Sequence, residues 1–194
     1  MTAGEKKARQ RSAAVAARRA ADPVARKVWD HAIARRVLDL PEFRRARVIL
    51  SYCAMAGEAD PAEIDRAARA LGKVVAYPRC CGEGVMIAAV PEAEDALERS
   101  PLGMMEPAPG RYSAVPPEAL DLVLAPCAAF DSRCVRIGMG GGYYDRYLPL
   151  CTGVRVAALA YEVQRVPRAE REAHDVPVDA VVSDRALYRA EEQA

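Results

Sequence analysis

The chain has 194 residues, 52% of them hydrophobic, and a formal net charge of +1 at pH 7. A chain of this size can bury a substantial core, and we expect one domain over residues 1–194, in which basic N-terminal helices within residues 1–46 pack on an α/β core. No apolar stretch approaches the roughly 18 to 20 residues of a membrane crossing, and the N-terminus lacks the apolar centre of a secretion signal, so we expect a cytoplasmic protein with no membrane partner.

The cysteine and histidine content argues against a zinc site. The six cysteines, of which Cys80 and Cys81 are adjacent, form no CxxC pair and no Cys/His spacing of the zinc-binding kind, and the chain has only two histidines. Zinc sites need such clusters. We therefore predict six reduced thiols.

The first quarter of the chain is strongly basic. Residues 1–47 hold thirteen Lys or Arg against five Asp or Glu, a net charge of +8, which leaves −7 for the remainder. This charge fits a solvated helical face, a contribution to an anionic ligand site, or a nucleic-acid-binding or transit segment. Because Trp29 and Phe43 are the only aromatic residues there, the stacking residues of a single-strand binder are missing, and we expect no nucleic-acid partner.

Two helices are predicted in this basic region. Ala and Arg, both strong helix formers, dominate Lys6 to Arg19, and Asp22-Pro23 then supplies an N-cap followed by a first-turn proline. The apolar residues of the second helix fall on one stripe and are Trp29, Ile33, Val37 and Leu40. We assign Trp29 to core packing rather than ligand stacking, and His31, which lies off the stripe, to the surface.

A βαβ unit follows. Arg47 to Cys53 is apolar and β-branched enough for a buried strand, and a helix then opens at Asp60-Pro61 and stops at Gly72. The apolar face of this helix consists of Ile64, Ala68 and Leu71. Lys73 to Tyr77 is the next strand, so the two strands should run parallel.

Four further strands are predicted, and their alternation with helices indicates a three-layer α/β fold. They are Val85 to Val90, Leu122 to Ala125, Arg155 to Tyr161 and Ala180 to Val182. The segment from Pro91 to Pro117, rich in Pro, Glu and Ala, interrupts this order and is interpreted as a long connection, either a lid or a solvated excursion.

The most informative run is Arg136 to Arg146, RIGMGGGYYDR. Ordered glycines cost folding entropy, so Gly138, Gly140, Gly141 and Gly142 indicate a bend where side chains must be absent and backbone N–H groups approach a ligand, most simply a phosphate. A helix starting at Tyr143 would add the attraction of its N-terminal dipole. Asp145 would then hold magnesium or, alternatively, only cap the helix.

The two common nucleotide-binding motifs do not fit this run. A GxGxxG fingerprint beginning at Gly138 would need glycine where Tyr143 stands, and GxxxxGK[ST] occurs nowhere in the chain. The run is therefore a different kind of ligand-binding loop. If no other feature of a binding site accompanies it in the chain, it is a plain flexible turn.

Several separated motifs together resemble the 5-formyltetrahydrofolate cyclo-ligase family, also called 5,10-methenyltetrahydrofolate synthetase, over nearly the full chain. They are Lys7 and Arg11 in the basic helix, Gly57-Glu58, Gly72-Lys73, Tyr77-Pro78, Glu106-Pro107, Pro126, Phe130-Asp131, Arg136 to Arg146, Gln164 and His174-Asp175. In the basic helix, Arg9 or Arg18 would serve as well as Arg11.

The resemblance implies a fold and a reaction. The fold is a three-layer α/β/α sandwich with a mostly parallel, mixed sheet, Rossmann-like and similar to the CoA-transferase-like fold. The reaction is the conversion of 5-formyltetrahydrofolate to 5,10-methenyltetrahydrofolate with release of ADP and phosphate, with ATP as co-substrate and Mg²⁺ as cofactor. The γ-phosphoryl group of ATP moves to the formyl oxygen, and N10 of the folate then attacks the activated carbon. The partners expected are these small molecules only, with the protein a monomer.

The resemblance also implies roles for individual residues. Tyr143 and Arg136 would be catalytic, and Asp145 and Asp175 would bind the metal. The ATP site would comprise Lys7, Arg11, Arg136, Ile137, Gly138, Met139, Gly140, Gly141, Gly142, Tyr143 and Tyr144. The folate site would comprise Cys53, Glu58, Met139, Gly140, Gly141, Gly142 and Tyr143.

Each role has a structural alternative, and two positions depart from the family pattern. Glu58 fits a solvated loop carboxylate and Asp175 a turn, while His174, Tyr144 and Tyr147 fit structural roles. Cys134 replaces a usual glycine, and Met139 stands where a tyrosine or a basic residue is common. The alternative functions are therefore a catalytically silent folate- or nucleotide-binding paralogue, a nucleic-acid-associated protein and a sugar-phosphate isomerase.

Overall fold

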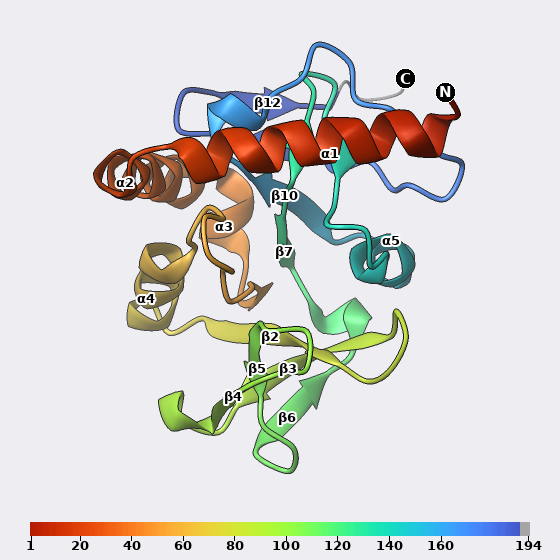
Figure 1. Ribbon diagram of the computed structural model, residues 1–194. Helices are drawn as coiled ribbons and strands as arrows, with labels where there is room; N and C mark the ends of the chain where they lie inside the picture. The colour runs from red at the N-terminus through yellow and green to blue at the C-terminus, as the bar shows by residue number, and fades with distance from the viewer. Residues whose placement is uncertain (191–194) are drawn as a thin grey trace.

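The computed structural model describes residues 1–190, beginning with two long helices (Figure 1). α1 spans Ala3–Ala20 and begins with a capping box between Thr2 and Glu5. α2 spans Pro23–Asp39, and the side chain of Asp22 accepts a hydrogen bond from the backbone N–H of Val24 at 3.1 Å. Both predicted helices and the predicted cap are thus confirmed. Within the described part of the chain, every helix falls short of the length or the apolar character that a membrane crossing requires.

The central sheet has eight strands in the order β12-β11-β10-β7-β1-β2-β3-β6. Neighbours from β11 to β2 pair in parallel, and β3, β6 and β12 pair antiparallel, so the predicted mostly parallel, mixed α/β sheet is confirmed. The strands are β1 (Val48–Leu50), β2 (Val74–Cys80), β3 (Met86–Pro91), β6 (Tyr112–Val115), β7 (Leu122–Pro126), β10 (Arg155–Leu159), β11 (Ala180–Val182) and β12 (Leu187–Arg189).

The predicted βαβ unit is present as β1, α4 (Ala62–Ala70) and β2, and Val48 pairs with Val74 in a parallel register. One detail of the prediction was wrong. Leu71, expected on the buried face of the helix, is 66% exposed because α4 ends at Ala70 and the chain turns at Gly72, where φ is +73°.

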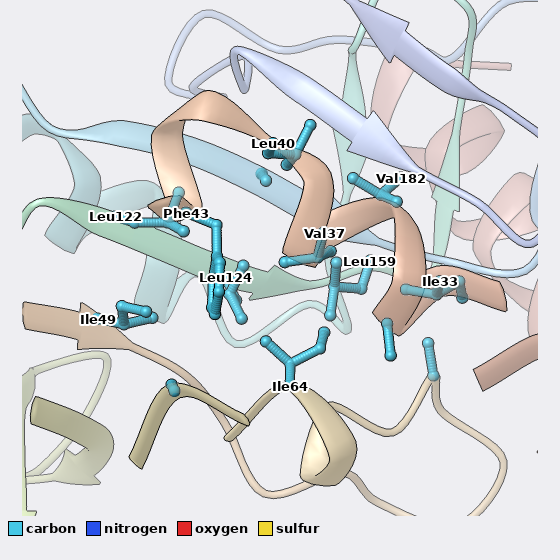
Figure 2. Close-up of a cluster of buried hydrophobic side chains, with 14 of the residues drawn as sticks. Ile33, Val37, Leu40, Phe43, Ile49, Ile64, Leu122, Leu124, Leu159 and Val182 are labelled. Atoms are coloured by element: carbon cyan, nitrogen blue, oxygen red, sulfur yellow. The ribbon is translucent and has the colours of Figure 1, made fainter. Parts of the chain in front are cut away.

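Hydrophobic residues cover both faces of the sheet because successive strand residues point to opposite sides. On one face, Ile49 and Leu124 pack against α2, α3 (Pro41–Arg45) and α4 (Figure 2). On the other, Leu50 and Val123 pack against α5 (Tyr143–Tyr147). Figure 1 shows α2, α3 and α4 together on one side and α5 on the other. The predicted apolar stripe of α2 is confirmed, and the ring of Trp29 packs against that of Tyr161 in a tilted arrangement, with 5.2 Å between the ring centroids.

The segment 91–117, interpreted as a long connection that interrupts the strand order, contains three strands, and in this respect the interpretation was wrong. This segment forms β4 (Leu97–Arg99), which pairs with β5 (Met105–Pro107), and β6, which adds to the edge of the main sheet beside β3. The buried carboxylate of Glu106 accepts a hydrogen bond from the backbone N–H of Cys80 at 3.0 Å, which ties β5 to β2. Strands this short could not be recognised from the sequence, because the segment is rich in proline and proline is unusual inside a strand.

A smaller cluster holds α1 on the core. Ala14 of α1 packs with Ala129, Val135 and Ile137, which lie in or beside the two-stranded ribbon of β8 (Ala129–Phe130) and β9 (Arg136–Ile137). The basic helix therefore lies directly over the strand that leads into the glycine-rich run.

Candidate active site

The candidate site is a cleft at the carboxyl end of the parallel strands. From β1 the chain continues through α4 to β2 on one side, whereas from β7 it continues to β10 and β11 on the other, so the strand order reverses between β1 and β7. Open α/β sheets bind ligands at such a reversal. The cleft opens there, beside Cys53 after β1 and Pro126 at the end of β7, and holds about 740 Å³ when the part open to solvent is included.

The cleft brings together most of the predicted site residues. Its lining is Tyr52, Cys53, Met55, Glu58, Pro78, Cys80, Met86, Met104, Met105, Pro126, Arg136, Gly138, Met139, Gly141, Gly142, Tyr143, Tyr144 and Asp145. Five predicted residues are not in this lining: Lys7, Arg11, Ile137, Gly140 and Asp175. Ile137 is fully buried in the cluster under α1, so its side chain has a packing role.

The loop between β9 and α5 is a bend that requires glycine. Gly140 has φ +103° and Gly142 has φ +66°, conformations that residues with a Cβ rarely adopt. A Cβ on Gly141 would lie 2.9 Å from the ring of Tyr143, and one on Gly142 would lie 2.8 Å from Nη1 of Arg146. A side chain is thus disfavoured at Gly140, Gly141 and Gly142, as the sequence predicts, whereas Met139 in the same bend carries a side chain that lines the cleft.

Arg136 is a buried cation at the base of the cleft. Its side chain is 2% exposed, and Nη2 donates to Oδ1 of Asp145 at 3.0 Å while Nη1 donates to the carbonyl of Pro126 at 3.2 Å. The guanidinium lies 5.5 Å from the ring centroid of Tyr144. Its Nε is buried and has no hydrogen-bond partner among the described residues. Asp145 lies in the first turn of α5, where we predicted it, and contacts this cation.

Two basic residues of α1, one helical turn apart, reach the same region. Nε of Arg11 donates to the carbonyl of Gly138 at 2.7 Å. Nζ of Lys7 contacts the carboxylate of Asp175 and lies 3.2 Å from Oε2 of Glu172. Of the two alternatives to Arg11, Arg9 is exposed and Arg18 has a different partner, so the geometry favours Arg11 as the residue beside the glycine bend.

Asp175 is a buried anion held in its charged form. Burial alone would raise its pKa, but the backbone N–H of Glu172, which donates at 2.8 Å, and the ammonium of Lys7 outweigh this and hold the pKa below 3.8. One ligand atom each from Asp175, His174 and Glu172 lies within 4.8 Å of the others, the only such group of three among the described residues. Asp145 is not in this group.

Glu58 is a second buried carboxylate, which excludes the alternative of a solvated loop residue. Oε1 accepts a hydrogen bond from Nη2 of Arg18 at 3.3 Å, and Oε2 accepts one from the backbone N–H of Met55 at 3.1 Å. Arg18 is 1% exposed and also donates to the carbonyl of Cys127 at 3.2 Å. We assigned no such partner to Glu58, although Arg18 follows Lys7 and Arg11 at helical spacing on one face of α1.

The turn between β2 and β3 supports the bend and was not predicted as part of the site. Nε of Arg146 donates to the carbonyl of Gly84 at 2.8 Å, and its Nη2 contacts the carbonyl of Gly141. The hydroxyl of Tyr143 donates to the carbonyl of Gly82 at 3.4 Å. Tyr143 is therefore fixed between the glycine bend and this turn.

All six cysteines are free, as predicted. Cys53 lines the cleft, and burial raises its pKa to about 11, so at neutral pH it is a thiol rather than a nucleophilic thiolate. Cys134 adopts a left-handed φ of 63°, which suits the glycine usual in the family at this position. Tyr144 and Tyr147 are buried, in agreement with their packing roles.

Comparisons with known proteins agree with this geometry. A family model described as the 5-formyltetrahydrofolate cyclo-ligase family matches residues 3–184. The 5-formyltetrahydrofolate cyclo-ligase of Escherichia coli (strain K12) is 28% identical over 177 residues, which are 88% of this chain and 96% of that protein.

Two solved structures have the same fold. The structure of Aquifex aeolicus 5,10-methenyltetrahydrofolate synthetase matches with a TM-score of 0.84 and 27% identity, over 97% of this chain and 94% of that one. A 5,10-methenyltetrahydrofolate synthetase from Mycoplasma pneumoniae matches with a TM-score of 0.75 and 21% identity, over 92% of this chain and 98% of that one, and supports the fold. The family match covers almost the whole chain and includes every segment of the cleft, and the chain therefore belongs to the 5-formyltetrahydrofolate cyclo-ligase family.

Proposed function

We propose that the protein is an enzyme that converts 5-formyltetrahydrofolate to 5,10-methenyltetrahydrofolate in this cleft, using ATP and Mg²⁺. The observation that carries the proposal is that one cleft joins a glycine-rich bend and a buried arginine, Arg136, to a buried carboxylate, Glu58. The bend and Arg136 suit a phosphate, and Glu58 suits the N–H groups of a pterin ring. The names of the relatives give the substrate and product.

In this proposal the triphosphate lies along the glycine bend. Backbone N–H groups of residues 138–142 face its oxygens, and Lys7, Arg11 and Arg136 supply positive charge. The buried Nε of Arg136, which has no partner among the described residues, is a donor that a phosphate oxygen would satisfy.

The carboxylates fit a magnesium ion in their chemistry. Mg²⁺ prefers hard oxygen ligands and accepts one or two protein carboxylates together with phosphate oxygens. Asp145 and Asp175 would hold it, and each is now neutralised by a cation, Arg136 and Lys7 respectively. When bound, the ion would neutralise negative charge on the phosphate oxygens.

The formyl oxygen would attack the γ-phosphorus, and the bond from that phosphorus to the ADP oxygen would break. N10 would then attack the formyl carbon and lose its proton, and the bond between that carbon and the phosphorylated oxygen would break to release phosphate. This chain would orient the folate through Glu58, which Arg18 and the backbone of Met55 hold in place. Tyr143, fixed by the turn after β2, would lie beside the formyl group.

An absorbance assay tests the proposal. Purified protein with 5-formyltetrahydrofolate, ATP and Mg²⁺ should develop the near-ultraviolet absorbance of the methenyl product, and omission of ATP or Mg²⁺ should abolish the signal. Calorimetry of both ligands on the same sample provides the control. Binding without turnover would support a catalytically silent paralogue instead, and neither binding nor turnover in a folded sample would reject the proposal.

We further propose that the enzyme acts as a monomer, since a single chain supplies every residue assigned above. Light scattering coupled to size-exclusion chromatography would test this, and a dimer at assay concentrations would contradict it.

A further inference from the structure

Met139 is an exposed methionine within the glycine bend. The residue is 43% exposed. Its neighbours in the chain, Gly138 and Gly140, have no side chains that could shield its sulfur from solvent. Met139 also lines the cleft, so it borders both solvent and the space proposed for the ligands. None of the roles argued above for phosphate, metal or formyl transfer uses its sulfur.

Exposure distinguishes Met139 from the other methionines, all six of which lie in the described part of the chain. Met86 is buried, and Met1, although more exposed, is not part of the cleft lining. The remaining three line the cleft and are half-buried: Met55, Met104 and Met105. An oxidant must reach a thioether sulfur to react with it, so susceptibility follows exposure. Met139 is therefore the internal methionine that a small oxidant reaches first.

The sulfur of Met139 lies beside a buried cation. Nη2 of Arg18 donates to Sδ of Met139 at 3.8 Å, and the same nitrogen donates to Oε1 of Glu58 at 3.3 Å. A thioether is a weak acceptor, whereas oxidation converts it into a polar group whose oxygen accepts hydrogen bonds. The Arg18 guanidinium would therefore hold an oxidised Met139 side chain in the cleft. A polar oxygen there would lie among apolar side chains and would disfavour an apolar ligand ring.

We propose that Met139 is an oxidative modification site, at which hydrogen peroxide forms methionine sulfoxide and thereby weakens folate binding. The sulfur attacks one peroxide oxygen and the O–O bond breaks. The hydroxide that leaves takes the proton from the transferred oxygen and becomes water, so the sulfur is oxidised and the peroxide is reduced. The effect on folate rests on the proposed function, whereas the oxidation does not. Because tyrosine and basic residues, common in the family at this position, contain no sulfur, the sensitivity is a property of this chain.

Peptide mapping and steady-state kinetics test the modification site. The wild type, Met139→Leu and Met104→Leu are treated with hydrogen peroxide and then with dithiothreitol, which reverses disulfides and sulfenic acids but leaves methionine sulfoxide in place. Mass spectrometry of proteolytic peptides gives the fraction of each methionine that has gained an oxygen atom. KM and kcat for 5-formyltetrahydrofolate are compared with those of the untreated sample of the same protein. Met104→Leu is the matched control, because Met104 lines the same cleft but is half-buried.

In the wild type, we expect Met139 to be oxidised several-fold faster than Met104. Once Met139 is fully oxidised, KM should rise about fivefold with kcat nearly unchanged. Met104→Leu should respond in the same way, whereas peroxide should leave the KM of Met139→Leu unchanged. Methionine sulfoxide reductase should restore the wild-type KM. Oxidation of Met104 before Met139, an unchanged KM with Met139 fully oxidised, or an equal rise of KM in Met139→Leu would overturn the proposal.

A further variant tests the effect on binding without an oxidant. Met139→Gln places an amide oxygen near the position of the sulfoxide oxygen, so its KM should exceed that of Met139→Leu about fivefold. A wild type that is inactive before any treatment would be a failure of the proposed function and not of this site. Peptide mapping would then still show whether Met139 is oxidised first, and calorimetric titration with 5-formyltetrahydrofolate would replace KM. Equal affinities of Met139→Gln and Met139→Leu would overturn the effect on binding.

Discussion

Replacement of Arg18 by methionine should destabilise the protein by about 3 kcal/mol, because it leaves Glu58 as a buried charge with no counter-ion. The two side chains are 1% and 4% exposed, and Nη2 of Arg18 lies 3.3 Å from Oε1 of Glu58. Methionine preserves most of the apolar length of the arginine side chain. The loss of the ion pair is therefore the main change.

The magnitude follows from the distances. Two unit charges 3.3 Å apart attract by about 5 kcal/mol at an effective dielectric constant of 20, and removing one partner of a buried pair costs about 3 to 5 kcal/mol. The lower end applies here because other partners remain. Glu58 keeps its bond from the backbone of Met55, and the carbonyl of Cys127, which also bonds to Arg18, keeps the 2.7 Å bond from Gln164. For a domain of this size, 3 kcal/mol lowers the melting temperature by roughly 6 to 12 °C.

Urea denaturation measures the free energy of unfolding of each variant. Arg44→Met is the matched control, since Arg44 pairs with Asp39 at 2.8 Å but the two side chains are 65% and 75% exposed, and the expected loss is below about 0.5 kcal/mol. The double variant Arg18→Met/Glu58→Gln should be less destabilised than the sum of its single changes. A loss below about 1 kcal/mol for Arg18→Met, or strict additivity in the double variant, would refute the argument.

Three further changes test the site. Asp145→Asn should lower kcat about 100-fold without loss of fold, because the amide still accepts a hydrogen bond but lacks the charge that a metal needs. Gly140→Ala should lower kcat/KM about tenfold, because alanine opposes a φ of +103° in the bend. In the Asp175→Asn variant, the free energy of unfolding should fall less steeply than in the wild type as the pH is lowered. The depressed pKa of Asp175 gives stability that is present at neutral pH and is lost as pH falls below 3.8.

Each of these changes has a control or an opposing outcome. Gly72→Ala introduces similar strain at a φ of +73° with nothing within 4 Å of the new Cβ, so it should reduce stability and leave activity unchanged. Equal activities for Gly140→Ala and Gly72→Ala would contradict a role for the bend. Full activity of Asp145→Asn would remove the metal assignment. An acid unfolding curve for Asp175→Asn that parallels the wild-type curve would show that this carboxylate gives no linked stability.

The parts of the fold that could be predicted are those with a strong local pattern. A few consecutive residues are enough to predict a long helix that has a cap and an apolar stripe. The same holds for a strand that is buried on both faces, such as Leu122–Pro126. The short strands Leu97–Arg99 and Leu187–Arg189 were not predicted, because they contain charged residues and are stabilised mainly by their pairing with distant strands. The misplacement of Leu71 has a similar cause, since its position depends on where the helix ends.

In the candidate site too, the features that could be predicted are those that depend on consecutive residues. The glycine bend could be predicted because its conformation is a property of consecutive residues, and Gly140 and Gly142 do take positive φ. The contacts that support the bend could not be predicted from the sequence. Arg146 reaches the turn at Gly84, 62 residues earlier in the chain, and no local pattern indicates that contact. The pairing of Arg18 with Glu58 is also a tertiary contact, and only the helical spacing of Arg18 with Lys7 and Arg11 hints at it.

The charges of the site are balanced before any ligand binds. Arg136 neutralises Asp145, and Lys7 neutralises Asp175, so each candidate metal ligand is paired with a candidate phosphate ligand. Burying these charges singly would cost several kcal/mol each, and pairing offsets that cost. Under the proposed function, a magnesium ion and a triphosphate arriving together would exchange partners with both pairs: the carboxylates would bind the ion and the cations would bind the phosphate oxygens. Either ligand alone would bind one partner of each pair and leave the other as a buried charge without a counter-ion, so under the proposed function we expect the two to enter as a single complex.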